Sequence, residues 1–189
     1  MAIALSARFN DALVWAASLH QNQVRKTSNT PYIGHLLSVA GLVIESGGSE
    51  DQALAALLHD VIEDQGVSVA EITSKFGQKV ADLVDAVTES YTEPKPDWEQ
   101  RKRLYLDKLR NSSPEVVLIS LADKLHNARA LEEGLHAHGE IVWEKFFKSR
   151  KQETFWFYKE LMEVYRTKGF NNSWLLLELE RSVERIFNG

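Results

Sequence analysis

The sequence predicts an all-α protein, and three observations support that prediction. Apolar residues recur at steps of three and four residues along most of the 189-residue chain, which is the spacing of one helix face. No stretch shows the alternation of apolar and polar residues that is typical of a half-buried strand. Glycine, with 10 residues, and proline, with 4, are scarce, so strong helix breakers are few. We expect one domain over residues 1–189, a helical bundle of about eight to ten helices.

The first half of the chain carries clear helix-start signals. A helix over about residues 6–21 is followed by the polar segment RKTSNT. Thr30 and Pro31 suit an N-cap and a first helical position, and they predict a helix from there to about residue 46. Two capping-box patterns begin the next helices, Ser49 with Gln52 and Ser68 with Glu71.

The second half is predicted from one loop and two further caps. The segment YTEPKPD, residues 91–97, holds two of the four prolines and is predicted to be a loop. Asp97 suits the start of a helix rich in Arg and Lys, and Ser113-Pro114 suits the start of the helix VVLISLADKLHNARAL. Three elements complete the chain: a turn over 133–139, a long aromatic helix over about 141–168 and a last helix over 173–187.

The composition excludes several classes of site and partner. There is no cysteine, so disulfides and thiolate metal sites are excluded, and a cytoplasmic location is expected. The N-terminus shows no signal peptide, and no stretch reaches about 18 apolar residues, so no membrane span is expected. The net charge of −5 argues against broad nucleic-acid binding but allows a small phosphorylated ligand in a local basic pocket. The composition leaves the oligomeric state open.

An adjacent histidine and aspartate, His59-Asp60, close the apolar run ALAALLHDVIED. Burying two ionisable groups is costly unless a partner or a metal ion satisfies them. Glu63 lies four residues after His59 and Asp64 four residues after Asp60, so in a helix the two members of each pair share a face. Acidic charge at such a helix end also opposes the helix dipole. An isolated His-Asp pair is more often a buried hydrogen bond, but this crowding of carboxylates favours a metal site.

Two other apolar helices each carry a polar residue that could complete that site. His35 lies in PYIGHLLSVAGLV, and Asp123 follows a mostly apolar run with Asn127 one turn later. His126, three residues after Asp123, could touch the surroundings of the ligands but is not one of them. The candidate set of two imidazoles and two carboxylates suits a divalent first-row metal, and its members are His35, His59, Asp60 and Asp123.

Basic residues cluster in two places, Arg25-Lys26 in the loop after the first helix and Arg101-Lys102-Arg103 after the proline-rich loop. On an acidic protein such clusters usually form a solvated face. The alternative is neutralisation of a phosphate group, for which Arg offers bidentate contacts and Lys a point charge. The residues alone leave both interpretations open.

Four strings in order, VRKTSNTPYIGHLLSVA, ALLHDVIED, FGQKVADLVDAVTE and LADKLHNARAL, resemble the hydrolase domain of the RelA/SpoT family within the HD-domain phosphohydrolases. They are most similar to its small, single-domain alarmone hydrolases. The resemblance covers about residues 8–131, and the C-terminal helices over about 141–188 match only loosely. It implies an HD-type helical bundle that uses Mn²⁺ to remove the 3′-pyrophosphate of (p)ppGpp, which releases GDP or GTP.

The resemblance implies a role for each matched residue. The Mn²⁺ ligands would be His35, His59, Asp60 and Asp123, and Glu63 with Asp64 matches the catalytic pair. The substrate contacts would be Arg25 and Lys26 at the base, Tyr32 lining the nucleotide pocket and Asn127 near the ribose and phosphate. Arg101 and Lys102 are further candidates for neutralising the pyrophosphate. Such a chain would bind a small-molecule nucleotide and no nucleic acid or membrane.

Three alternatives remain beside this hypothesis. One is an HD-type hydrolase of adenine alarmones, (p)ppApp, or of another phosphorylated nucleotide. Another is a non-catalytic nucleotide sensor that kept the pocket, and the last is a structural helical domain without a metal. The aromatic run from Phe155 to Tyr158 is interpreted as core or interface packing rather than as a platform for base stacking.

Overall fold

The structure, a computed structural model, describes residues 4–90, 97–148 and 150–188. These residues contain helices and no strand, and their only β pairing is an isolated bridge between Val24 and Pro31, so the predicted all-α class is confirmed. The elements are α1 (Ala7–Leu19), α2 (Ile33–Glu45), α3 (Glu50–Leu58), α4 (Val61–Gln65), α5 (Val69–Phe76), α6 (Gln78–Val87), α7 (Trp98–Arg110), α8 (Pro114–His138), α9 (Ile141–Phe147), α10 (Lys151–Tyr165), a π-helical turn η1 (Arg166–Phe170) and α11 (Trp174–Asn188).

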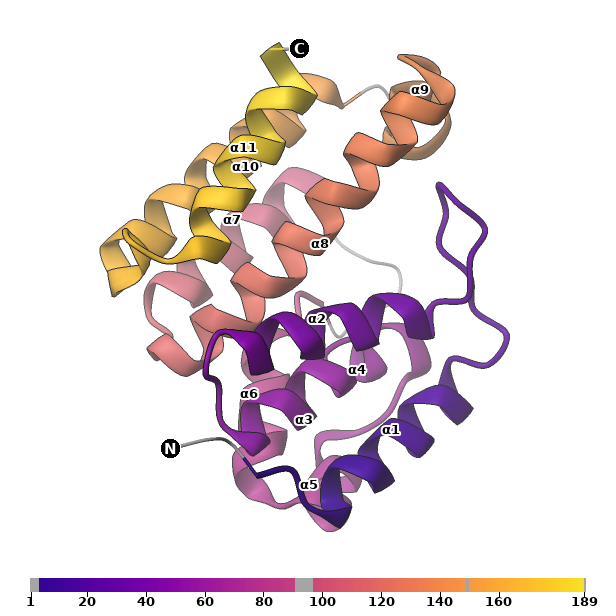
Figure 1. Cartoon of the computed structure of the whole chain (residues 1–189), viewed down its shortest axis with the longest axis vertical. Helices are drawn as coiled ribbons and strands as arrows, with labels where there is room; N and C mark the ends of the chain where they lie inside the picture. The colour runs from indigo at the N-terminus through magenta and orange to yellow at the C-terminus, as the bar shows by residue number, and fades with distance from the viewer. Residues whose placement is uncertain (1–3, 91–96, 149, 189) are drawn as a thin grey trace.

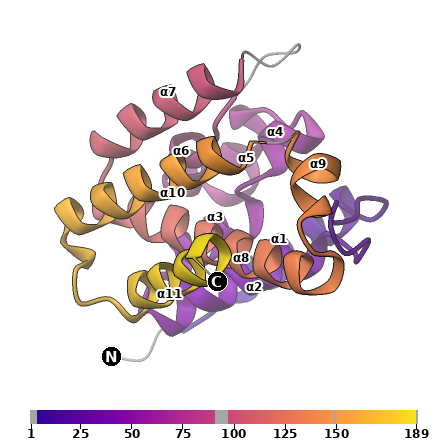
Figure 2. The same ribbon diagram turned by 90° about the horizontal axis from the view of Figure 1, so that it is seen from above.

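The helix α8 joins two groups of helices. Helices α1 to α6 gather on one side of it, in the lower part of Figure 1, and α7, α10 and α11 lie on the other. The view from above shows α7 and α10 running side by side (Figure 2). Because α8 contacts α2, α3, α6, α9 and α11, every residue from Val116 to Asp123 on its first turns is buried. A polar residue in this stretch therefore faces other side chains whichever way it points.

Most of the predicted caps are present in the structure. Ser49 and Ser68 each accept a hydrogen bond from the backbone of the third residue of the helix, and both capping boxes are complete. Asp97 accepts from the backbone N–H of Glu99 and begins α7. Pro114 stands in the first turn of α8, as predicted. Of the predicted loop at 91–97, residues 91–96 lie outside the described residues.

The predicted start of the second helix at Thr30 and Pro31 is wrong by about one half-turn. The backbone N–H of Arg25 donates to the carbonyl of Thr30 at 2.8 Å, and that of Tyr32 donates to the carbonyl of Gln23 at 2.9 Å. This pairing closes the loop after α1 into a short hairpin, which is visible beside α1 and α2 in Figure 1. Helix α2 begins only after this pairing ends.

The C-terminal half departs from two further predictions. The predicted turn over residues 133–139 is wrong, because α8 continues to His138 and ends at Gly139. Leu131 and Gly134 are buried on this last part of the helix. The predicted aromatic helix over 141–168 is divided, because Lys148 adopts a left-handed conformation (φ 51°) that ends α9. The predicted last helix is confirmed as α11. No helix among the described residues is long and apolar enough to cross a membrane.

Candidate metal centre and substrate cleft

The four predicted metal ligands come together from three places in the fold. His35 lies in the first turn of α2, His59 and Asp60 form the turn between α3 and α4, and Asp123 lies on α8. Helices α2, α3 and α8 pack on one another, and this packing brings the four side chains together. We call His35, His59, Asp60 and Asp123 the His-Asp cluster.

The distances within the His-Asp cluster are short. His59 Nε2 lies 3.0 Å from Asp60 Oδ2 and 3.6 Å from Asp123 Oδ1. His35 Nε2 lies 3.3 Å from Asp123 Oδ1 and 3.6 Å from Asp60 Oδ2. One ligand atom from each of His35, His59 and Asp123 falls within 4.8 Å of the others. Two imidazole nitrogens and two carboxylate oxygens converging in this way suit a divalent first-row cation.

The hydrogen bonds and charges of the cluster leave one nitrogen of His59 facing the carboxylates. His59 Nδ1 donates to the carbonyl oxygen of Ala56 at 2.8 Å, so Nε2 is the nitrogen that faces Asp60 and Asp123. Burial would lower the pKa of His59, but the two carboxylates raise it above its usual range. Burial alone would raise the pKa of Asp60, but His59 and His35 hold it well below its usual range. Burial would also raise the pKa of Asp123, but Lys124 and the two imidazoles outweigh it. Both carboxylates are therefore ionised at neutral pH.

The predicted catalytic pair stands one turn beyond the cluster, on α4. The backbone N–H of Asp64 donates to the carbonyl of Asp60 at 2.9 Å, and the Gln23 amide donates to the Asp64 carboxylate at 2.8 Å. The inference that these acids oppose a helix dipole is wrong. Because α3 ends at Leu58, Glu63 and Asp64 lie in the first turn of a new helix, where the dipole favours negative charge.

Three predicted substrate contacts are hydrogen-bonded into the cluster. The Tyr32 hydroxyl donates to Asp60 Oδ2 at 2.6 Å, and burial with the nearby Asp60 charge raises the pKa of Tyr32, which keeps that proton in place. The Asn127 amide donates to Asp123 Oδ1 at 2.6 Å and accepts from the Arg25 guanidinium at 2.8 Å. The predicted substrate contacts and the predicted metal ligands thus form one hydrogen-bonded network.

Three neighbouring cavities, which all include Asn127 in their walls, make up a hollow beside the cluster. An inner chamber of about 160 Å³ is lined by Tyr32, His59, Asp60, Glu63, Asp64, Glu89, Asp123 and Lys124 among others. An aromatic chamber of about 200 Å³ is lined by Arg25, Trp98, Lys102, Lys124, Phe147, Phe157 and Tyr158 among others. An outer cleft of about 520 Å³ is lined by Gln23, Arg25, Lys26, Arg101, Lys148 and Arg150 among others.

The predicted basic pair of α7 reaches this hollow but is already partnered. Arg101 and Lys102 donate to the two oxygens of Glu89 at 2.8 and 2.6 Å. Burial alone would raise the pKa of Glu89, yet Lys102, Lys124 and Arg101 hold it below its usual range. The pKa of Lys102 is lowered, because burial and the repulsion from Lys124 and Arg101 together outweigh the attraction of Glu89. One carboxylate thus serves several cations, and an anionic ligand here would relieve their repulsion.

The comparison with known families decides the class of this centre. The sequence model described as an HD domain matches residues 12–147. The chain belongs to the HD domain family. Membership implies a divalent metal, and the grouped donor atoms of His35, His59 and Asp123 could hold one.

The relatives of this HD domain include named pyrophosphohydrolases. The chain is 42% identical over 125 residues to guanosine-3′,5′-bis(diphosphate) 3′-pyrophosphohydrolase MESH1 of Xenopus tropicalis. This alignment covers 65% of this chain and 68% of the relative. The MESH1 protein of Homo sapiens is 40% identical over 129 residues, or 67% of this chain and 70% of the relative. The predicted resemblance is confirmed.

The similarity of fold extends further along the chain than the similarity of sequence. A solved structure of a metazoan ortholog of SpoT, described as hydrolyzing ppGpp and playing a role in starvation responses, is 32% identical with a TM-score of 0.79. The match covers 97% of this chain and 97% of that chain. The C-terminal helices, which resemble the family only loosely in sequence, therefore share its fold.

Several residues of this hollow were not predicted from the sequence. Lys124 donates to Asp123 Oδ2 at 2.6 Å and lines both the inner chamber and the aromatic chamber. Its position in LADKLHN, directly after a predicted ligand, is the signal in the sequence that could have identified it. Trp98, Lys148 and Arg150 line the outer cleft and come from segments that meet only in the fold. The Arg150 guanidinium lies over the Trp98 ring, 5.7 Å from its centroid.

The aromatic run on α10 packs against other side chains and also borders a cavity. Phe155 lies on the ring of Phe187, with the ring centroids 4.8 Å apart, as expected for packing. Phe157 and Tyr158 are buried but also form part of the wall of the aromatic chamber. The run therefore packs as predicted, although two of its rings also border a cavity.

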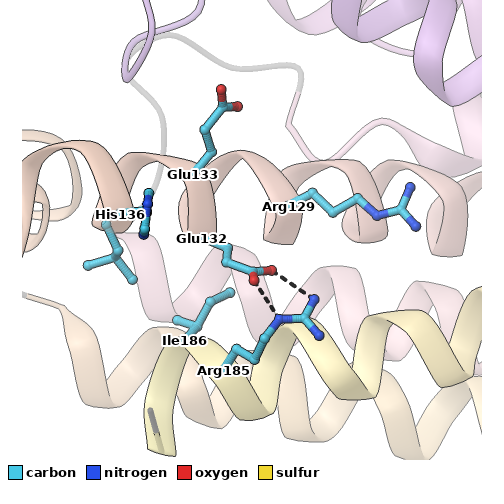
Figure 3. Close-up of a pocket in the computed structure, with 7 residues that line it drawn as sticks. Arg129, Glu132, Glu133, His136, Arg185 and Ile186 are labelled. Atoms are coloured by element: carbon cyan, nitrogen blue, oxygen red, sulfur yellow. Dashed lines mark hydrogen bonds and ion pairs between the residues drawn. The ribbon is translucent and has the colours of Figure 1, made fainter.

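A separate hollow lies between α8 and α11 (Figure 3). It is lined by Arg129, Glu132, His136 and Arg185, and the Glu132 carboxylate forms a two-point ion pair with Arg185. Its walls share no residue with the three cavities beside the cluster. Its charges are largely neutralised by each other, so it is a poor candidate for the catalytic centre.

Proposed function

We propose that this chain is a pyrophosphohydrolase that removes the 3′-pyrophosphate of ppGpp and pppGpp, with Mn²⁺ as its metal, and that residues 1–189 form one hydrolase domain. The observation that carries the proposal is that Glu63 and Asp64 line the same inner chamber as His59, Asp60 and Asp123. A nucleotide sensor has no need of a carboxylate pair beside a metal cluster. The names of the relatives support the choice of substrate.

The metal ligands in this proposal are the four residues of the His-Asp cluster. A bound divalent cation supplies positive charge next to the phosphoryl group that is attacked. The ligand set contains no sulfur and combines imidazole with carboxylate, which suits Mn²⁺ among the first-row metals. Tyr32 and Asn127 fix the orientation of Asp60 and Asp123 through the hydrogen bonds described above.

Glu63 and Asp64 position the attacking water and take its proton. The water oxygen forms a bond to the phosphorus that is attached to the ribose 3′-oxygen, and the bond between that phosphorus and the 3′-oxygen breaks. Pyrophosphate leaves with the added oxygen, and the 3′-oxygen gains a proton to become the hydroxyl of GDP or GTP. Gln23 fixes the orientation of the Asp64 carboxylate by its 2.8 Å hydrogen bond.

The three cavities suit the three parts of such a substrate. The inner chamber is too small for a nucleoside, but His59, Asp60, Asp123 and Lys124 line it, so it fits the 3′-pyrophosphate. The aromatic chamber fits a purine ring, with Trp98 and Phe157 as apolar walls. The outer cleft, which is within the usual size range of ligand sites, carries Lys148 and Arg150 for the 5′-phosphates, while Lys26 stays with Arg25 as a contact to the base.

A substrate panel tests the proposed function. The purified chain loaded with Mn²⁺ is expected to release pyrophosphate from ppGpp and pppGpp but not from GTP, which has no 3′-phosphate. Release from (p)ppApp alone would show that the purine assignment is wrong. Tight binding of ppGpp without release would favour a sensor. Absence of Mn, Fe, Co and Zn by elemental analysis after Mn²⁺ supplementation would favour a structural domain.

A further inference from the structure

A second histidine pair lies behind the His-Asp cluster. His126 Nδ1 is 2.8 Å from His35 Nδ1, and the two ring centroids are 4.8 Å apart. His35 is on α2, whereas His126 is on α8, one turn after Asp123. The contact is made by the nitrogen of His35 that points away from the cluster, since Nε2 is the atom that faces Asp60 and Asp123.

The hydrogen bond between the two rings permits only one arrangement that leaves His35 ready for a metal. A bond between two imidazole nitrogens needs one donor and one acceptor. A neutral His35 that offers its Nε2 lone pair to a cation carries its proton on Nδ1 and donates it. His126 then accepts at Nδ1 and carries its own proton on Nε2.

The two ligand histidines differ in how this tautomer is fixed. His59 donates to the backbone carbonyl of Ala56, which has no proton to give and so can never reverse the bond. His35 depends on a side chain that could act as either donor or acceptor. If His126 donated instead, the proton of a neutral His35 would move to Nε2 and block the nitrogen that faces the cluster. The identity of residue 126 therefore affects the cluster although it is not a ligand.

We infer that His126 is a positioning residue, which holds His35 in the Nδ1-protonated tautomer and thereby sets the affinity of the site for its divalent metal. The inference rests on the proposed function in so far as it takes the His-Asp cluster to be the metal site. It goes beyond the proposed function because it assigns control of metal affinity to a residue outside the ligand set. Removing such an outer partner typically weakens metal binding about 10–100-fold.

Three substitutions separate this role from simple packing. His126→Leu keeps apolar bulk but removes the acceptor, and it is expected to weaken Mn²⁺ and Zn²⁺ binding about 10–100-fold. His126→Asn places an amide oxygen near the position of Nδ1 and is expected to restore affinity to within about threefold. His136→Leu, also on α8 but lining the separate hollow, is the matched control and is expected to bind metal like the unchanged protein.

The measurements are metal affinity by chelator competition, without nucleotide, and ¹⁵N NMR of the histidine rings in the Zn²⁺-loaded protein. In the unchanged chain His126 should carry its proton on Nε2 and accept at Nδ1, and in His126→Leu the Nδ1 proton of His35 should lose the chemical shift of a hydrogen-bonded proton. Equal metal affinity in His126→Leu and the unchanged protein, or a His126 protonated on Nδ1 in the loaded unchanged chain, would overturn the inference. Failure of the unchanged chain to bind metal would overturn the proposed site as well, whereas normal metal binding without pyrophosphate release would count against the proposed function alone.

Discussion

The buried His-Asp cluster and the exposed rim of the outer cleft use charge in opposite ways. His35, His59 and Asp123 are 2%, 5% and 7% exposed, and their polar atoms are held by partners on α3 and α8. On the rim, Lys26 and Lys148 are exposed, and neither has an ion-pair partner among the residues that the structure describes. Buried and fixed charges can direct chemistry at one atom. Exposed charges attract an anion from a distance, and salt weakens that attraction.

The largest expected effect separates metal binding from proton transfer within the buried region. His59→Ala removes a ligand and is expected to lose both metal and turnover, with kcat lower by about 10³-fold or more. Asp64→Asn removes a base but no ligand, so it is expected to keep the metal and lower kcat by about 10²–10⁴-fold. Metal content by elemental analysis and pyrophosphate release measure the two effects. Normal turnover in Asp64→Asn would remove Asp64 from the proposed mechanism.

The next effect concerns Glu89, which stands between the two regions and neutralises Arg101 and Lys102. Its pKa is below the ordinary 4.5, so its charge stabilises the folded state above about pH 4.5, and this contribution is lost as the pH falls through the lowered pKa. Glu89→Gln is expected to lower the free energy of unfolding by about 2–4 kcal/mol at neutral pH. The difference from the unchanged chain should shrink at acid pH.

Urea unfolding at several pH values measures this difference. The matched control is Glu140→Gln, which breaks the exposed ion pair of Glu140 with Lys151 and is expected to cost less than about 1 kcal/mol. A loss for Glu89→Gln that stayed the same from neutral to acid pH would show that its charge is not the source of the stability.

The smallest effect belongs to the rim. The double substitution Lys148→Ala with Arg150→Ala is expected to raise KM about 3–10-fold for ppGpp, to leave kcat nearly unchanged, and to matter less as salt increases. Lys145→Ala, an exposed lysine of α9 outside the cavity walls, is the control. Steady-state kinetics at two salt concentrations provide the test. An equal rise in KM for a substrate without 5′-phosphates would show that the rim does not hold those groups.

The sequence alone determined the features that depend on local chemistry. The capping boxes at Ser49 and Ser68 were predictable because each links a side chain to a backbone three residues away. The family was predictable because the strings around His35, His59 and Asp123 carry its motifs in order. The same strings named the residues that meet in the His-Asp cluster, and their ligand role stays a prediction.

The tertiary structure decided what depends on contacts between distant segments. The start of α2 moved because the segment around Val24 pairs with Pro31, and α8 continued beyond the predicted turn because it is packed between other helices. The pairing of His126 with His35 and the wall that Lys148 and Arg150 add to the outer cleft join residues with no relation in sequence. Local patterns report the backbone and the side chains nearest to it. Only the packing of the helices determines which side chain hydrogen-bonds to a histidine on another helix, as His126 does to His35.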